Sequence, residues 1–171
     1  ARRAGVTIWE DTALVDLERS GAAMSVRTSG GTIRAGAVLL ATNAFRSPLA
    51  AVNRRIAPVY DYVLATEPLS PEQLSSIGWS NRQGISDTTN QFHYYRLTAD
   101  DRIVWGGYDA VYHYGSRIDP VLDQREATHR LLAEHFFDTF PQLEDVSFTH
   151  RGGGVIDPCT RFSVTFGTSH D

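Results

Sequence analysis

The chain has 171 residues, of which 42% are hydrophobic and 21% charged, a balance typical of a soluble globular protein with room for one large domain or for one domain and part of another. Its formal net charge of −4 argues against a nucleic-acid or anionic-membrane surface, because both need clustered Lys and Arg. No apolar run approaches the roughly 20 residues of a membrane-spanning helix, and no signal-peptide pattern opens the chain.

The cysteine content and the two ends of the chain indicate its setting. The single cysteine, Cys159, excludes an internal disulfide and favours a reducing, cytoplasmic compartment. The chain begins without Met at Ala1 and stops abruptly at Asp171. Both ends suggest an internal piece of a longer protein.

The first quarter of the chain predicts β-structure. Short strand-like runs occur at Val6–Ile8 and at Leu14–Leu17, and Met24–Thr28 alternates apolar and polar residues as a half-buried strand does. Ser29–Gly31 predicts a hairpin turn, where glycine supplies a positive φ. The continuous apolar run Ala37–Ala41 predicts a strand buried on both faces.

The middle of the chain predicts helices and strands in turn. A short helix is expected over Ser47–Val52 and a long strand over Ile56–Thr66. Ser70 followed by Pro71 and by Gln73 is typical of a helix start, and Gly78 marks the end of that helix. These elements follow each other without strict βα alternation.

Further on, Phe92–Leu97 and Arg102–Tyr108 predict an antiparallel hairpin. The longest helix is expected over Pro120–Phe140, opened by Asp119 and closed by Pro141.

The tail, from Val146 to Phe166, predicts strands interrupted by Gly152–Gly154 and by Asp157–Pro158. Strands outnumber helices over the whole chain. The fold class is therefore α+β, with a mixed or antiparallel sheet and flanking helices.

The histidines and glycines do not form a known catalytic motif. His129 and His135 are six residues apart and lie on different faces of a helix, and no HExxH or CxxC occurs, so no metal site is predicted. A serine hydrolase is disfavoured because GxSxG is absent. Close backbone packing is a better explanation of Gly152–Gly154 than a phosphate loop.

Aromatic residues predict either a core or an amine pocket. Tyr60 and Tyr62 are two apart on one strand and share a face, and Phe92, Tyr94 and Arg96 share a face of another strand. Such residues often only fill a core. As a group they equally suit an amine substrate, because a cation or its neutral form can rest against ring faces.

Several segments together resemble the D-amino-acid-oxidase-like (DAO) family of FAD-dependent oxidoreductases, and most of all its γ-glutamylputrescine-oxidase-like amine oxidases. The resemblance rests on short segments spread over nearly the whole chain: Gly5–Ile8, Asp11–Val15, Gly31–Ala35, Val38–Asn43, Pro58–Glu67 and Arg102–Gly107. It implies residues 1–45 as part of the FAD-binding domain and residues 46–171 as a C-terminally truncated substrate-binding domain.

The resemblance also implies roles for individual residues. The residues expected to contact FAD are Leu14, Ala41, Thr42 and Asn43. Asn43 stands where the family usually has Gly, although Asn tolerates positive φ better than most residues. The expected substrate-facing wall consists of Tyr60, Tyr94 and Arg96, and no catalytic residue is assigned.

Departures from the family refine these expectations. Ile156 stands near the place where α-amino-acid oxidases carry an Arg that binds the substrate carboxylate. Gly152 stands where the sarcosine-oxidase branch has a flavin-linked Cys and amine-oxidising relatives often have Trp, so the implied FAD is non-covalent. The family's GxGxxG is absent, and the chain alone is expected to bind no FAD and to be inactive.

The implied activity of the full-length protein is oxidation of the C–N bond of a small amine or amino compound to an imine by hydride transfer to flavin. Two alternatives stay open. One is a flavin dehydrogenase or demethylating enzyme of the same fold, with another substrate and electron acceptor. The other is a self-standing β-rich ligand-binding module without redox activity.

Overall fold

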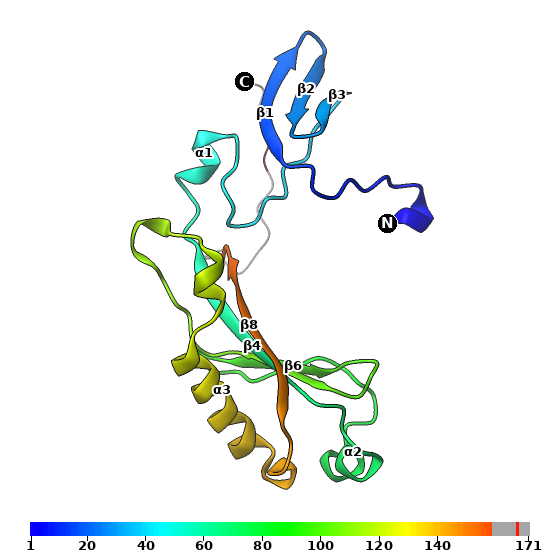
Figure 1. Ribbon diagram of the computed structural model, residues 1–171, viewed down its shortest axis with the longest axis vertical. Helices are drawn as coiled ribbons and strands as arrows, with labels where there is room; N and C mark the ends of the chain where they lie inside the picture. The colour runs from blue at the N-terminus through cyan, green and yellow to red at the C-terminus, as the bar shows by residue number, and fades with distance from the viewer. Residues whose placement is uncertain (159–166, 168–171) are drawn as a thin grey trace. The chain divides into compact units, whose positions relative to one another are not determined.

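The computed structural model describes residues 1–158 and 167, and it divides into two compact units (Figure 1). The first unit contains Ala1–Ile56, and the second begins at Ala57 and contains every described strand from β4 onward. Cys159 and the end of the predicted tail strands lie outside the described residues.

The first unit is built on a three-stranded antiparallel sheet with the strand order β1-β2-β3. Thr28 pairs with Gly31, which leaves Ser29 and Gly30 at the turn and confirms the predicted hairpin. The elements of this unit are the 3-10 helix η1 (Arg2–Ala4), β1 (Leu14–Ser20), β2 (Ala23–Thr28), β3 (Gly31–Ala35) and α1 (Ala50–Asn53).

The prediction of a strand at Ala37–Ala41 is wrong. The segment has no regular structure, and the Leu39 side chain is 84% exposed. A strand that is apolar on both faces is stable only when neighbouring strands pair with its edges and other elements cover its faces. Within residues 1–158 no strand pairs with this segment. The same reason applies to Val6–Ile8, which forms no strand either.

The second unit contains a five-stranded sheet with the order β5-β6-β7-β4-β8, in which every described pair of neighbours is antiparallel. The predicted hairpin is confirmed, because its strands pair from His93 opposite Gly107 to Leu97 opposite Ile103. The α+β class with antiparallel sheets is also confirmed. The strands are β4 (Val59–Thr66), β5 (Ile85–Ser86), β6 (His93–Leu97), β7 (Ile103–Gly107) and β8 (Phe148–Ile156).

The helix predicted after Ser70 is confirmed as α2 (Pro71–Ile77). Ser70 and Gln73 form a capping box, in which each side chain accepts a hydrogen bond from the other residue's backbone N–H. Gly78 ends the helix in the left-handed conformation, with φ of 63°.

The long helix predicted over Pro120–Phe140 is split into the 3-10 helix η3 (Pro120–Asp123) and α3 (Glu126–Thr139). Gln124 and Arg125 between them have extended backbone angles. In a continuous helix the Leu122 carbonyl would accept from the backbone N–H of Glu126. It accepts instead from the Tyr62 hydroxyl at 2.7 Å, which offsets the lost helical bond. The remaining helices are the 3-10 helices η2 (Tyr114–Ser116) and η4 (Pro141–Leu143).

The core of the second unit lies between α3 and one face of the sheet (Figure 1). Trp105, which is 1% exposed, packs edge-on against Phe136 of α3, with ring centroids 5.7 Å apart. Alternate residues of β4 point to the same side, where η3 also packs. The opposite side of the sheet, here called the open face, carries Asp61 and Val63 of β4, which are half-buried.

Strand β8 continues through Gly152–Gly154, so the predicted interruption there is wrong. The close packing expected of these glycines is confirmed at Gly153, which pairs with Tyr62. A Cβ atom at Gly153 would lie 2.4 Å from Cδ1 of the Tyr62 ring, so only glycine leaves room for that ring.

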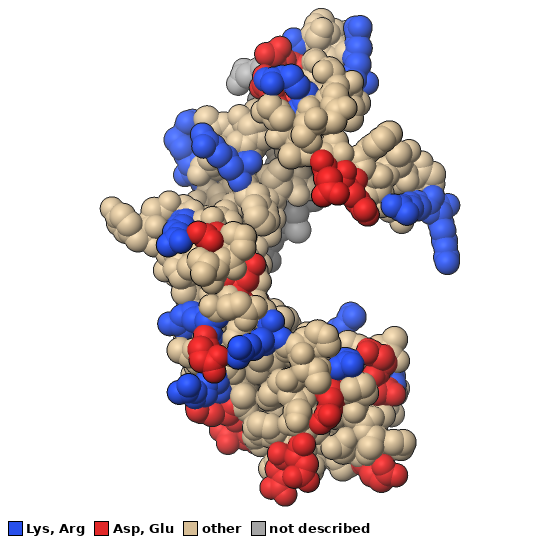
Figure 2. Space-filling model, viewed as in Figure 1, with Lys and Arg blue, Asp and Glu red and all other residues tan. Residues whose placement is uncertain are grey.

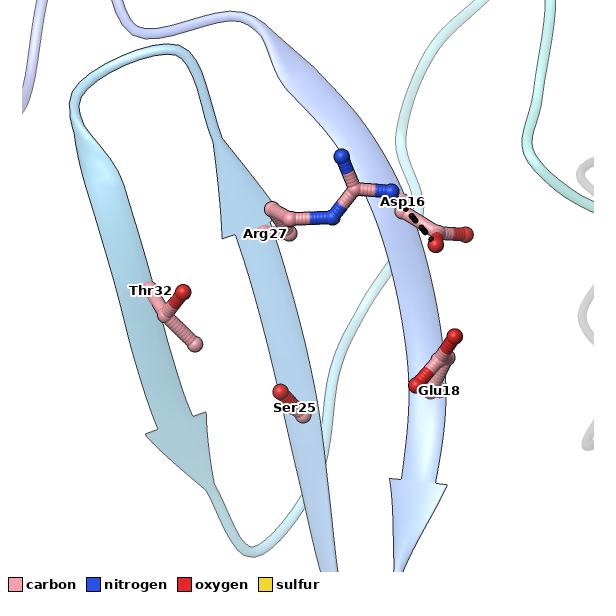
Figure 3. A pocket seen from close by; sticks show the side chains of 5 residues that line it. All are labelled: Asp16, Glu18, Ser25, Arg27 and Thr32. Atoms are coloured by element: carbon pink, nitrogen blue, oxygen red, sulfur yellow. Dashed lines mark hydrogen bonds and ion pairs between the residues drawn. The ribbon is translucent and has the colours of Figure 1, made fainter.

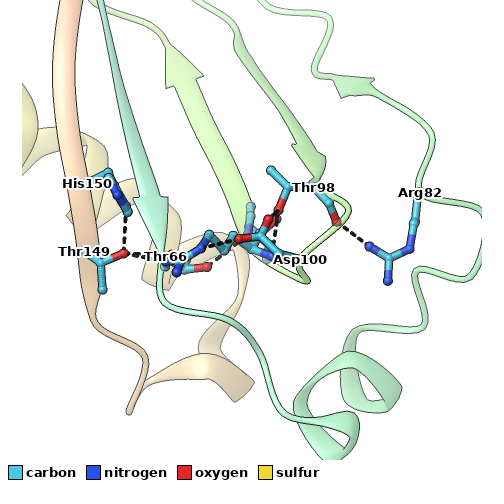
Figure 4. A network of polar contacts seen from close by, with 8 residues as sticks. Thr66, Arg82, Thr98, Asp100, Thr149 and His150 are labelled. Carbon is cyan, nitrogen blue, oxygen red and sulfur yellow. Dashed lines mark hydrogen bonds and ion pairs between the residues drawn. The ribbon is translucent and has the colours of Figure 1, made fainter.

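A polar network at the end of β4 holds three segments of the second unit together (Figure 4). The Arg102 guanidinium donates to the Thr66 carbonyl at 2.9 Å and to the Thr149 hydroxyl at 2.7 Å. Its Nε donates to the Asp100 carboxylate at 2.8 Å. Strands β4 and β8 and the β6–β7 turn are thereby fixed relative to one another.

On the face shown in Figure 2, acidic and basic side chains are interspersed over the second unit. In the described part of the chain, no helix has both the length and the apolar character needed to cross a membrane.

Candidate active site

A tyrosine and a carboxylate from two strands meet on the open face of the second unit. Tyr94 lies on β6 and Asp61 on β4, with β7 between them. The Tyr94 hydroxyl donates to Oδ2 of Asp61 at 2.6 Å, so its side chain crosses the whole width of β7.

Two glycines of β7 make this crossing possible. Gly106 lies between Tyr94 and Val63 in the strand register. A Cβ atom at Gly106 would lie 3.0 Å from the Tyr94 hydroxyl oxygen and 2.5 Å from a methyl carbon of Val63. Gly107 has φ of 96°, and a Cβ atom there would lie 3.3 Å from Cδ1 of Tyr94. Bare backbone thus forms the surface on which the tyrosine ring rests.

Burial and hydrogen bonding act in opposite directions on the Asp61 carboxyl. Burial is the larger effect and raises its pKa, while hydrogen bonds from Tyr94 and from the backbone N–H groups of Tyr62 and Gly107 lower it. The pKa of Tyr94 is raised, first by burial and then by its hydrogen bond to Asp61. Tyr94 therefore keeps its proton and acts as the donor.

The other side of Asp61 is bordered by two glycines of the edge strand β8. Gly154 pairs with Asp61 and Gly152 with Val63, so both lie on the open face. In the described part of the chain, a Cβ atom at Gly154 would meet no atom within 4 Å, and one at Gly152 would meet a Gln124 nitrogen at 3.9 Å. Gly152 and Gly154, called the glycine strip below, leave open space beside the carboxylate.

The structure brings together two of the three predicted substrate-facing residues. Tyr94 is 37% exposed, and Arg96 follows it on the same face of β6 and is also exposed. Tyr60 lies on the opposite, helix-covered face and is 1% exposed. Its hydroxyl donates to the Asp119 carbonyl at 3.2 Å and accepts from the Asp119 N–H at 3.0 Å. Tyr60 therefore anchors η3 to the sheet.

Sequence reasoning missed Asp61. The signal was present, because Asp61 is the only charged residue in the strand Val59–Thr66 and stands between two tyrosines that both face the other side of the sheet. A carboxylate in the middle of an otherwise apolar central strand needs a specific partner or a function.

The residues expected to contact FAD all lie in the first unit. Leu14 opens β1 and pairs with Thr28. Asn43 has φ of 49°, the left-handed conformation that its place in a Gly-like turn requires, and the Thr42 carbonyl accepts from the Phe45 N–H at 3.0 Å. Such a turn fits close approach of the backbone to the edge of a nucleotide.

A small hollow on the sheet of the same unit does not fit the pyrophosphate of FAD. It is lined by Asp16, Glu18, Ser25, Arg27 and Thr32 (Figure 3). Two of these side chains are carboxylates, and Arg27 already pairs with Asp16 at 2.8 Å. A pyrophosphate needs uncommitted N–H donors or cations, so this hollow suits no such anion.

A second polar cluster lies on the helix-covered side of the second unit. His93 stacks against Trp105, with ring centroids 4.5 Å apart, and is 8% exposed. Its Nδ1 lies 3.1 Å from the Asp87 carboxylate and its Nε2 3.1 Å from Nδ1 of His135. With Asp87 ionised, His93 donates from Nδ1 and accepts at Nε2 from His135, an assignment that follows from the network. Among residues 1–158 and 167, no three metal-binding side chains come together as a site.

The comparison with solved structures identifies the fold. Over 98% of the chain, the fold superposes on glycine oxidase from Geobacillus kaustophilus with a TM-score of 0.71 and 17% identity, covering 42% of that chain. Over 93% of the chain it matches L-proline dehydrogenase from P. horikoshii with a TM-score of 0.70 and 19% identity, covering 41% of that chain. The fold is that of the DAO-like flavoenzymes.

The sequence comparison gives the family directly. The family model described as "DAO: FAD dependent oxidoreductase" matches residues 1–169, and the chain belongs to this family. It is 30% identical over 168 residues to the probable oxidoreductase OrdL of Haemophilus influenzae, covering 95% of this chain and 36% of that protein. It is 32% identical over 152 residues to γ-glutamylputrescine oxidoreductase of Escherichia coli, covering 88% and 33%. The chain thus spans about a third of the length of these curated relatives.

Proposed function

We propose that the full-length protein oxidises the C–N bond of a small amine or amino compound to an imine, with FAD as the hydride acceptor. Family membership supports the flavin. The names of similar proteins, among them a γ-glutamylputrescine oxidoreductase, a glycine oxidase and an L-proline dehydrogenase, refer to amino compounds. FAD, when bound, supplies the redox chemistry, and the protein binds, orients and desolvates the amine.

One observation carries the assignment to an amine, namely the Tyr94–Asp61 pair on the open face. A carboxylate and an aromatic ring side by side attract an ammonium group through charge and through the ring face. Arg96 on the same face supplies a positive charge for a second, anionic part of a substrate. The substrate wall in this proposal is therefore Tyr94 and Arg96, with Asp61 in the place first expected for Tyr60.

The proposal divides the chain between two domains of the parent protein. Residues 1–45 belong to the FAD-binding domain, with Leu14 and Ala41–Asn43 beside the cofactor, and residues 46–171 to the substrate-binding domain. The FAD is held without a covalent bond, because Gly152 stands where the sarcosine-oxidase branch has its flavin-linked Cys and has no side chain to form that bond. The cytoplasm is the proposed location.

The position of Ile156 favours an amine over an α-amino acid. Its side chain is 41% exposed and cannot bind a carboxylate. A carboxylate next to the reacting carbon would lose part of its hydration without the bidentate partner that arginine provides. The preferred substrate is an amine, or an amino compound whose carboxylate lies far from the oxidised carbon.

The test uses the product of the complete gene, purified and mixed with a panel of primary and secondary amines without oxygen. We expect yellow protein, bleaching of its flavin by at least one amine, and release of the matching carbonyl compound as the imine hydrolyses. Oxygen uptake during turnover then separates an oxidase from a dehydrogenase. Complete protein that carries no flavin would instead favour a ligand-binding module, and flavin that no amine reduces would refute the assignment.

A further inference from the structure

We infer that Asp61 is the residue that binds the amino group of the substrate and takes up the proton that this group loses before oxidation. The inference rests on the proposed function and adds a specific role to a residue that the family resemblance did not assign. It stands on the hydrogen-bond geometry of the carboxylate, on its lack of a cationic partner and on the open space beside it.

The hydrogen bonds of Asp61 leave capacity for one more donor. Its Oδ1 accepts from the backbone N–H of Tyr62 at 2.9 Å, and its Oδ2 accepts from the Tyr94 hydroxyl at 2.6 Å. The backbone of Gly107 supplies a third bond. An ionised carboxylate has about four acceptor positions. These three bonds fix the orientation of the carboxyl group and leave about one position for a ligand.

Among the described residues, Asp61 also has no cation paired with it. The ion pairs among the described residues include Asp16, Asp87, Asp100, Asp101, Asp109 and Asp119, but not Asp61. A half-buried carboxylate without a positive partner is unfavourable, and a bound ammonium group would supply that partner. The raised pKa of Asp61, caused mainly by burial, makes the carboxylate a stronger proton acceptor than an exposed aspartate.

The surroundings provide the space for such a ligand. The glycine strip on β8 presents bare backbone beside Asp61, and no atom of the described residues lies within 4 Å of a Cβ position at Gly154, directly opposite. The ring of Tyr94, held flat over Gly106, borders the other side. A primary ammonium group can therefore approach Asp61 over the strip while its carbon chain contacts the tyrosine ring.

Oxidation begins with the loss of a proton from the bound ammonium group to Asp61. An N–H bond of the ammonium group breaks, an O–H bond forms on Asp61, and the amine lone pair becomes available. The carbon then loses hydride, two electrons and one proton, to the FAD of the proposed function, and the lone pair forms the C=N bond of the protonated imine. Tyr94 remains protonated throughout and holds Oδ2 in place.

The experiment compares Asp61→Asn with wild type in the full-length protein, with Asp145→Asn as the matched control. Asp145 is exposed in the turn before β8. We expect Asp61→Asn to lower kcat/KM for a primary amine by about 100-fold, as for removal of one partner of a desolvated charge pair. The acidic limb of the pH profile of kcat/KM should disappear in this variant, because that limb reports protonation of Asp61 in the free enzyme. Asp145→Asn should match wild type in both respects.

A binding measurement independent of turnover uses tert-butylammonium, which has no hydrogen on the carbon that bears nitrogen and cannot be oxidised. Its neutral isostere, tert-butyl alcohol, is the control ligand. We expect isothermal titration calorimetry to show that tert-butylammonium binds wild type with an affinity that falls at acidic pH, and that it binds Asp61→Asn at least ten-fold more weakly. The alcohol should bind both proteins equally. If Asp61→Asn fails to fold, the pH dependence of ammonium binding to wild type decides alone, and affinity that stays constant through the acidic limb of kcat/KM overturns the inference.

The outcomes separate the two proposals. If wild type oxidises no amine, the proposed function fails and the inference fails with it. If wild type oxidises amines while Asp61→Asn keeps its kcat/KM, its acidic limb and its affinity for tert-butylammonium, only the role of Asp61 is overturned.

Discussion

Gly153 of β8 lies directly opposite Tyr62 of β4, and the Tyr62 ring occupies the volume that a side chain at Gly153 would fill. The ring can therefore lie under α3 and donate its hydroxyl proton to the Leu122 carbonyl at 2.7 Å. One glycine thus positions a buried tyrosine, and that tyrosine satisfies the carbonyl left free where the helix is broken.

This relationship predicts the effect of a single methyl group. Gly153→Ala places a carbon 2.4 Å from the Tyr62 ring, which must move and disturb the core. We expect a loss of about 1–3 kcal/mol in the free energy of unfolding. Gly154→Ala is the control, because nothing lies within 4 Å of its Cβ position. Urea unfolding, followed by circular dichroism, measures the stability of both variants. Equal midpoints for the two would contradict this packing of Tyr62 against Gly153.

Removing the Arg102 guanidinium should loosen the junction of β4 with β8 and with the β6–β7 turn. Arg102→Ala leaves the Thr66 carbonyl and the Thr149 hydroxyl without this donor. We expect a cost of about 1.5–3 kcal/mol, the range for hydrogen bonds that involve a charged group. Arg130→Ala on the exposed surface of α3 should change stability by less than about 0.5 kcal/mol. A cost at Arg102 no greater than at Arg130 would show that the network is unimportant.

The pair of Asp87 and His93 predicts loss of stability in acid. The pKa of Asp87 is lowered to about 2, and the main cause is the hydrogen bond that the His93 backbone N–H donates to it. Ionised Asp87 therefore stabilises the folded chain above pH 3.8, and this stabilisation is lost as the pH falls towards 2. Burial lowers the pKa of His93 from its ordinary value of 6.5. Below pH 6.5 the imidazole therefore takes up a proton more readily in the unfolded chain, and this favours unfolding. The urea midpoint should therefore begin to fall just below pH 6.5 and fall again below pH 3.8.

The variants His93→Gln and Asp87→Asn separate these two phases. His93→Gln should make the first decline smaller but not abolish it, because burial also lowers the pKa of His129. Asp87→Asn should make the second decline smaller, and the lowered pKa values of Asp16, Asp100 and Asp119 account for what remains. A midpoint that stays flat from pH 7 to pH 5 in the wild-type chain would contradict the buried, neutral state of His93.

The 171-residue chain by itself should be colourless. Its first unit holds the residues expected beside the nucleotide, but the hollow on its sheet is lined by carboxylates rather than by anion-binding donors. We expect no flavin absorbance after gel filtration of the chain mixed with excess FAD. A stoichiometric yellow complex would contradict this expectation and show that the chain holds the cofactor without a separate pyrophosphate site.

Local patterns predicted much of the second unit. Alternation over β6 and β7 was sufficient for the hairpin, and the Ser70 capping box for α2, because both depend on neighbours in sequence. The strand expected at Ala37–Ala41 depends on partners elsewhere, and apolar composition alone does not supply them. The break at Gln124–Arg125 depends on the Tyr62 hydroxyl, a contact over 60 residues that no local pattern reveals.

The same limit of local patterns explains why only part of the candidate site was predicted. The period of two along β6 correctly placed Tyr94 and Arg96 on one face, opposite His93. It could not relate β6 to β4, because the order of strands and their register are set by long-range pairing. Tyr60 consequently proved to lie on the other face, and Asp61, its neighbour, on the face of Tyr94.

Steady-state kinetics of the full-length protein test amine oxidation most directly, by comparing a primary amine with the α-amino acid that differs from it only by the carboxylate. We predict a higher kcat/KM for the amine, because Ile156 offers the carboxylate no partner. Arg96→Ala should leave this preference unchanged. A higher kcat/KM for the amino acid would contradict the account, and loss of that advantage in Arg96→Ala would identify Arg96 as the carboxylate anchor.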